Sequence, residues 1–100
     1  MVHVALFVRL HAKPGKEEEV AAFLAGALPL AQAEAGTTVW FALRFNKSEF
    51  GIFDAFPDDA GRRAHLEGPI AAALMARAGE LLSQPPAIER VDLLASKLPK

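Results

Sequence analysis

The sequence predicts a single α+β domain with the element order βαββαβ. Four short segments, 2–11, 37–45, 50–56 and 88–96, are rich in β-branched and large apolar residues, as strands are. The long segments that follow the first and the third of these carry apolar residues at spacings of three and four, which is typical of helices that bury one face. Elements in this order fit one domain of 100 residues.

The first half of the chain is expected to be a strand followed by a helix. The strand ends before a Pro-Gly turn at 14–15. The helix begins at Glu17, where acidic residues in the first turn complement the helix dipole, and it ends near Glu34. Pro29 is expected to kink this helix or to end its regular hydrogen bonding, because proline has no N–H to donate and its ring clashes with the preceding turn.

The second half is expected to be a hairpin, a divided helix and a last strand. The polar turn 46–49 joins the two strands of the hairpin. Asp58 can cap the helix that follows, and Pro69 divides that helix into pieces at 59–67 and 70–82. Right-handed crossovers then place both helices on one face of a four-stranded antiparallel sheet, which is the ferredoxin-like arrangement.

Both faces of this sheet are expected to be apolar. In the first strand Ala5 and Phe7 point away from Leu6 and Val8, and in the second strand Ala42 is expected on the face that the helices leave bare. Hydrophobic residues make up 52% of the chain and glycine 7 of its 100 residues. In ordinary domains these two classes together make up only about 45–50%. Two copies are therefore expected to stack sheet on sheet as a homodimer.

The charge balance and the cysteine count exclude several classes of partner and chemistry. The chain has 11 basic and 12 acidic residues in no long block, so neither a nucleic acid nor a membrane is expected as a partner. It has no cysteine, which excludes disulfides and thiolate chemistry. The first ten residues lack the features of a signal peptide, so a cytoplasmic protein is expected.

Neither a cofactor nor a metal is expected. The sequence has no P-loop and no glycine pattern of a dinucleotide-binding site. His3, Arg9 and His11 share one face of the first strand. At about 3.3 Å per residue the two histidines lie about 26 Å apart, which is too far for them to bind one metal ion.

Three stretches of the chain together resemble the antibiotic biosynthesis monooxygenase family of small dimeric α/β-barrel proteins: HVALFVRLHAKPGKEEEV, GTTVWFALRF and FGIFDAFPDDAGRRAHLEGPIAAAL. Family members often carry an AHL motif at a fixed spacing after an aromatic residue that ends a strand, and here the motif at 64–66 follows Phe56. Many members have Glu and Trp where this chain has Asp54 and Phe56, and a second histidine where it has Ile70. The resemblance implies one domain over 1–100, a homodimer, and cofactor-free oxidation of a quinol or polycyclic phenol.

Five residues are the candidates for this chemistry. His65 is the candidate base, because imidazole titrates near neutral pH, and Arg44 is the candidate for stabilising a phenolate. Trp40 can stack on a planar substrate, with Asp54 and Phe56 beside it as further substrate-binding residues. Each main candidate also has a structural reading: His65 bonded to Asp54, Arg44 paired with an acidic residue, and Trp40 packed in the dimer.

Two functions therefore compete. In the first, the chain is a cofactor-independent monooxygenase of a small aromatic substrate, since an electron-rich phenolate can react with oxygen directly. In the second, it is a non-catalytic homodimer of the same fold that binds a small ligand or serves assembly. The family resemblance favours the first function. The second rests on the absence of the family's second histidine and on Asp54 and Phe56 in place of its Glu and Trp.

Overall fold

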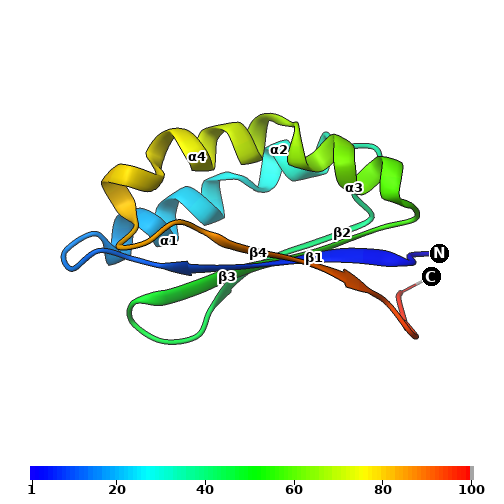
Figure 1. Ribbon diagram of the computed structural model, residues 1–100, viewed down its shortest axis with the longest axis horizontal. Helices are drawn as coiled ribbons and strands as arrows, with labels where there is room; N and C mark the ends of the chain where they lie inside the picture. The colour runs from blue at the N-terminus through cyan, green and yellow to red at the C-terminus, as the bar shows by residue number, and fades with distance from the viewer. Residues whose placement is uncertain (100) are drawn as a thin grey trace.

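The computed structural model describes residues 1–99 and shows one four-stranded antiparallel sheet with all helices on one face (Figure 1). The strand order is β2-β3-β1-β4. This confirms the predicted α+β fold with βαββαβ order, each helix being divided into two pieces. The elements are β1 (Val4–His11), α1 (Glu17–Gly26), α2 (Leu28–Gln32), β2 (Val39–Arg44), β3 (Glu49–Phe56), α3 (Asp59–Leu66), α4 (Pro69–Leu81) and β4 (Ala87–Asp92).

The first helix is interrupted at Ala27, two residues before Pro29, where the sequence predicted a kink or an end of regular hydrogen bonding. α1 ends at Gly26 and α2 begins at Leu28, so that Pro29 occupies the first turn of α2. Proline is tolerated there because the N–H groups of a first turn have no carbonyl of their own helix to bond. α2 then ends at Gln32, earlier than predicted.

The second helical segment is divided as predicted. Asp58 caps α3, because its Oδ1 accepts a hydrogen bond of 2.9 Å from the N–H of Gly61. Pro69 is the first residue of α4. The last strand is shorter than predicted, since β4 ends at Asp92, which pairs with Val4 at the start of β1.

The face of the sheet beneath the helices carries the main core. β1 contributes the buried side chains of Leu6, Val8 and Leu10. In the pairing of β1 with β3, Val8 lies beside Ile52 and Leu10 beside Phe50, so these β3 residues share the same face. The helices close this core with buried residues of α1 and α4: Val20, Leu24, Leu74 and Leu81.

The opposite face of the sheet is bare and is apolar at its centre. Val39 pairs with Ala55 and Phe41 with Phe53, and Phe53 pairs in turn with Phe7 of β1. Phe41 is 55% exposed, which is high for a large aromatic residue in a strand. Apolar side chains therefore lie on both faces, as the sequence predicted.

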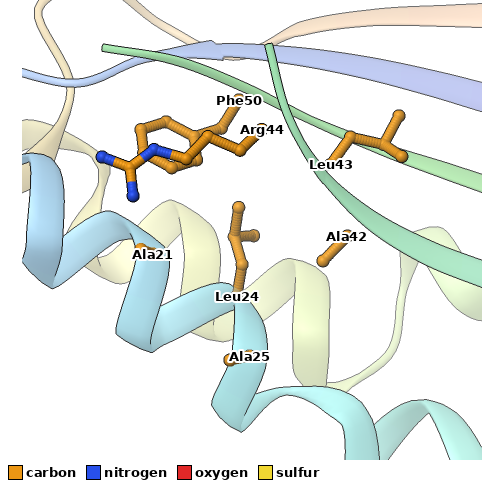
Figure 2. Close-up of a pocket in the computed structure, with 7 residues that line it drawn as sticks. All are labelled: Ala21, Leu24, Ala25, Ala42, Leu43, Arg44 and Phe50. Carbon is orange, nitrogen blue, oxygen red and sulfur yellow. The ribbon is translucent and has the colours of Figure 1, made fainter. Parts of the chain in front are cut away.

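Ala42 does not lie on the bare face, and the prediction that it does is wrong. Since Phe41 and Leu43 belong to the bare face, Ala42 points to the other side, toward α1 (Figure 2). There it lines a small cavity together with Leu24. Alternation along β2 separates the two sets of side chains, but only the pairing with β3 decides which set meets the helices.

Candidate functional site

His65 of α3 lies between two carboxylates, on the side of the helix that faces the sheet. Its side chain is 7% exposed. Its Nδ1 lies 2.5 Å from Oε1 of Glu34, and its Nε2 lies 2.9 Å from Oδ2 of Asp54. The ring of Phe56 packs beside the imidazole, with 5.5 Å between the ring centroids. We call Glu34, Asp54 and His65 the carboxylate–histidine cluster.

Three different elements bring the cluster together. Asp54 lies on the helix-facing side of β3 between Ile52 and Phe56, and its side chain is 1% exposed. His65 is on the side of α3 that faces the sheet. Glu34 follows the end of α2, where its Oε1 also accepts a hydrogen bond of 2.8 Å from the hydroxyl of Thr37. The cluster therefore ties the segment after α2 to β3 and α3.

The two carboxylates change the protonation of His65. Burial alone lowers the pKa of a histidine, because it disfavours the charged form. The close contacts with Asp54 and Glu34, and the negative charges of both, outweigh burial and raise the pKa of His65 to about 9. His65 is therefore an imidazolium at neutral pH, and it partly neutralises two buried carboxylates.

Several buried polar atoms around the cluster lack a hydrogen-bond partner among residues 1–99. They are Oε2 of Glu34, both carboxylate oxygens of Asp54 and Nε1 of Trp40. The contact between His65 and Asp54 is short, but it is an ion pair whose geometry is not that of a regular hydrogen bond. Because unpaired buried polar groups are costly, such a concentration of them is typical of a site for a polar ligand.

A cavity of about 310 Å³ opens beside the cluster. Glu34 and His65 form its polar wall. Gly36 and Gly61 allow two backbone segments to meet there, since a Cβ on Gly61 would lie 2.9 Å from the carbonyl oxygen of Gly36. The remaining lining residues are Ala35, Thr37, Ala64, Gly68 and Pro69.

Arg44 lies in a different place from the other predicted site residues. Figure 2 shows it beside Phe50 at the wall of a cavity of about 170 Å³ between α1 and β2. Its guanidinium lies 4.9 Å from the centre of the Phe50 ring and donates a hydrogen bond of 2.9 Å to Glu18. It lies four positions after Trp40 in the strand, which is about 13 Å. The structure therefore does not bring Arg44 to His65, and its acidic partner is Glu18.

Comparison with solved structures identifies the family. The structure superposes on NE2512, a protein of unknown function from Nitrosomonas europaea, with a TM-score of 0.98 and 68% sequence identity over 100% of this chain and 97% of that chain. The chain belongs to the same family as NE2512. It also superposes on Rv0793 from Mycobacterium tuberculosis with a TM-score of 0.82 and 22% identity over 94% of this chain and 97% of the other.

The comparison also identifies the type of fold. An antibiotic biosynthesis monooxygenase superposes with a TM-score of 0.79 and 13% identity, covering 92% of this chain and 99% of that chain. The chain therefore has the antibiotic biosynthesis monooxygenase fold, and the resemblance seen in the sequence is confirmed. No protein-family model matches the chain, and no curated protein does either.

Within this antibiotic biosynthesis monooxygenase fold, Trp40 lies next to the cluster. It is the strand partner of Asp54, and its ring packs against Ala27, Ala31 and Ile70. Trp40, Asp54, Phe56 and His65 thus come from one region, as the sequence predicted. Trp40 is on the helix side of the sheet, so it does not pack in an interface formed by the bare face.

Sequence reasoning missed Glu34, which it treated only as the end of a helix. The signal was its spacing, because Ala27, Ala31 and Glu34 follow one another at four and three residues and so share a helical face. Ala27 and Ala31 are both buried against Ile70. A carboxylate on a buried helical face needs a partner of opposite charge, so this spacing could have predicted a buried cation beside Glu34.

Residues 1–99 contain no group of three or more histidine, cysteine, aspartate or glutamate side chains arranged to hold a metal ion. Over the same residues, no helix is long and apolar enough to cross a membrane.

Proposed function

We propose that this protein is a cofactor-independent monooxygenase that acts on a quinol or polycyclic phenol. The observation that carries this proposal is the buried chain from Asp54 through His65 to Glu34, which ends at the wall of a cavity. The fold shared with an antibiotic biosynthesis monooxygenase supports the class of reaction.

In this proposal Glu34 accepts the phenolic proton. Its Oε1 is engaged by His65 and Thr37, whereas Oε2 is a buried atom with no hydrogen-bond partner among residues 1–99. A phenolic hydroxyl can bond Oε2 once the cavity wall beside Gly68 moves aside. The sequence had suggested His65 as the base. An imidazolium with a pKa of about 9 has no free lone pair at neutral pH, so His65 instead positions Glu34 and offsets its negative charge.

The substrate itself supplies the electrons for the reaction. The phenolate donates electron density to O₂, and a C–O bond forms at a ring carbon that carries hydrogen. Glu34 returns the phenolic proton to the resulting peroxide, which gives a hydroperoxide. Glu34 then accepts the proton of that carbon while the O–O bond breaks, and it passes this proton to the departing hydroxide, which leaves as water. A phenol and O₂ thus become a quinone and water, with one atom of the O₂ in each product.

The aromatic neighbours of the cluster lie behind the cavity wall. Phe56 is fully buried beside His65, and Trp40 is the strand partner of Asp54. Neither residue lines the cavity, so in this proposal both support the cluster and do not touch the substrate. Arg44 has no part in this proposal, because Glu18 and Phe50 hold it elsewhere.

Oxygen uptake with a panel of quinols and polycyclic phenols, measured on metal-free protein, tests the proposal. We expect protein-dependent uptake that Glu34→Gln lowers by about a hundredfold or more in kcat, the usual contribution of a general base. The matched control is Glu18→Gln, which removes an exposed carboxylate bonded to Arg44 and should leave uptake unchanged. Undiminished uptake in Glu34→Gln, with the fold intact by circular dichroism, excludes Glu34 as the proton acceptor.

A second function has its own supporting observation. Both ring nitrogens of His65 are already in contact with carboxylates, so the cluster can also serve only to hold three elements around a ligand cavity. The protein would then be a non-catalytic binding dimer. Binding of a planar phenol at the cavity, together with no uptake across the whole panel, would favour this function over the monooxygenase.

The homodimer is part of both functions, and we propose that the bare face of the sheet forms it. Phe7, Phe41 and Phe53 lie across adjacent strands of this face, and Phe45 at its edge is 45% exposed. A second copy of the chain offers the same apolar surface and can cover all four side chains about a two-fold axis. Two charged residues border this aromatic group: the guanidinium of Arg9 lies over the rings of Phe7 and Phe45, and Glu89 is the strand partner of Phe7. The interface would therefore have an apolar part flanked by charged groups, as interfaces with a polar rim do.

A further inference from the structure

α3 faces two cavities, and the second of them is lined by arginines. His65 faces the cavity of the carboxylate–histidine cluster, whereas Arg62, Arg63 and Leu66 line a separate cavity of about 290 Å³. Asp59 and Arg90 complete its lining. Three arginines and one aspartate leave an excess of positive charge around a cavity that the proposed oxygenase does not use.

Arg62 forms the fixed wall of this second cavity. Its side chain is only 11% exposed. Its Nε and Nη2 donate to Oδ1 of Asp59 at 3.1 and 2.8 Å, and its Nη1 reaches the carbonyl oxygens of Ala5 and Val91 at 3.3 and 3.4 Å. These contacts anchor α3 to β1 and β4, so Arg62 contributes a positive charge whose position is set by the fold.

Arg63 and Arg90 are the more exposed arginines of this cavity. Arg63 donates through Nη2 to Oδ2 of Asp59 at 2.7 Å, and its side chain is 65% exposed. Arg90 pairs with Leu6 across β4 and β1, so it lies on the helix side of the sheet and approaches the cavity from the opposite wall. Asp92 is on the same side of β4, but it does not line the cavity.

We propose that this cavity binds the oxyanion group of a small molecule, a phosphate or a carboxylate. Guanidinium groups bind both through paired N–H donors, and arginines from α3 and β4 can hold one anion from two directions. Leu66 gives an apolar surface for the rest of the ligand. The volume lies near the lower end of the range for small-molecule sites, which is about 300–1,000 Å³.

Nuclear magnetic resonance titration with phenyl phosphate and with benzoate, at constant ionic strength, tests this site. Both probes carry an aromatic ring for Leu66 and differ in their anion, so the tighter one identifies the preferred group. We expect amide shifts that include residues 90–91 as well as Arg62, Arg63 and Leu66. Phenol has the ring without the charge; it can bind at the cavity of the carboxylate–histidine cluster and shift Gly61, Ala64 and His65, but it should not shift residues 90–91.

Two variants separate a specific site from general attraction to positive charge. Arg63→Ala combined with Arg90→Ala should weaken the anion by about tenfold or more. Arg77→Ala removes one exposed arginine of α4, which pairs with Glu80, and should leave the affinity unchanged. Arg62 is kept, because its contacts hold the fold. Equal weakening by both changes, or shifts spread over many exposed arginines, would overturn the proposal.

Discussion

Nε2 of His65 and Oδ2 of Asp54 lie 2.9 Å apart in a region where neither side chain is more than 7% exposed. A cation and an anion in such a contact depend on each other, because each would be costly to bury alone. Glu34 adds a second anion on the other side of the imidazole. Protonation of His65 should therefore be linked to the stability of the whole fold.

We predict that the protein loses stability as the pH rises from about 6.5 to 9. The pKa of His65 is about 9 when folded and about 6.5 when unfolded, so the folded state binds the proton more tightly. The resulting stabilisation, about 3 kcal/mol, is fully present below pH 6.5 and is lost as the pH rises through 9. Urea unfolding at several pH values checks this.

The variants His65→Gln and His3→Gln provide the comparison for that pH series. The difference in unfolding free energy between the wild type and His65→Gln should shrink steadily toward pH 9 and above. His3 is exposed at the start of the chain, so His3→Gln should follow the wild type. A wild-type curve parallel to that of His65→Gln across this range would show that the folded state does not hold the extra proton.

A double-mutant cycle should detect strong coupling between Asp54 and His65. Asp54→Ala leaves a buried imidazolium with one carboxylate fewer, and it should be much less harmful once His65→Ala has removed that cation. We expect a coupling energy of about 1–3 kcal/mol in unfolding experiments at pH 7. The exposed pair of Glu18 and Arg44 provides the control cycle and should show no significant coupling. Additive effects of Asp54→Ala and His65→Ala would argue against an energetically important pair.

The sequence predicts this contact only in part. Alternation places Asp54 and Phe56 on one side of β3, and helical periodicity turns His65 toward the sheet, so a contact between Asp54 and His65 could be anticipated. Glu34 could not be placed as easily. Its position follows from the break at Ala27 and the short α2, and both depend on how the chain packs around Pro29.

The two errors about β2 have different physical origins. The sequence correctly puts Trp40 and Arg44 on one side of the strand, because side chains alternate. It says less about which side meets the helices, and Ala42 was assigned to the wrong one. The second error concerns the distance along the strand. Trp40 and Arg44 share a face, but they lie near opposite ends of β2, so Arg44 is beside α1 whereas Trp40 is beside Asp54.

Adjacent residues of β2 offer a sharp test of the proposed dimer. Phe41→Asp puts a charge on the bare face, beside Phe53, and should give a soluble 10.7 kDa monomer in sedimentation experiments at low micromolar concentration. Ala42→Asp introduces the same charge one residue later, on the helix side, where the alanine is exposed, and should leave the dimer intact. A wild type that sediments as a monomer, or a dimer of Phe41→Asp, contradicts an interface on this face.

Gly61 and Gly36 should be critical for stability, because their backbones touch beside the cavity of the cluster. A Cβ on Gly61 would lie 2.9 Å from the carbonyl oxygen of Gly36, so Gly61→Ala must push α3 away and should cost about 1–3 kcal/mol of unfolding free energy. Gly79 lies inside α4 with open space around it, so Gly79→Ala should instead stabilise the protein by up to about 1 kcal/mol. Urea unfolding of both variants measures the difference. If Gly61→Ala were as stable as Gly79→Ala, the close approach of the two backbones could not be a constraint on the fold, and the cavity wall would have room to move.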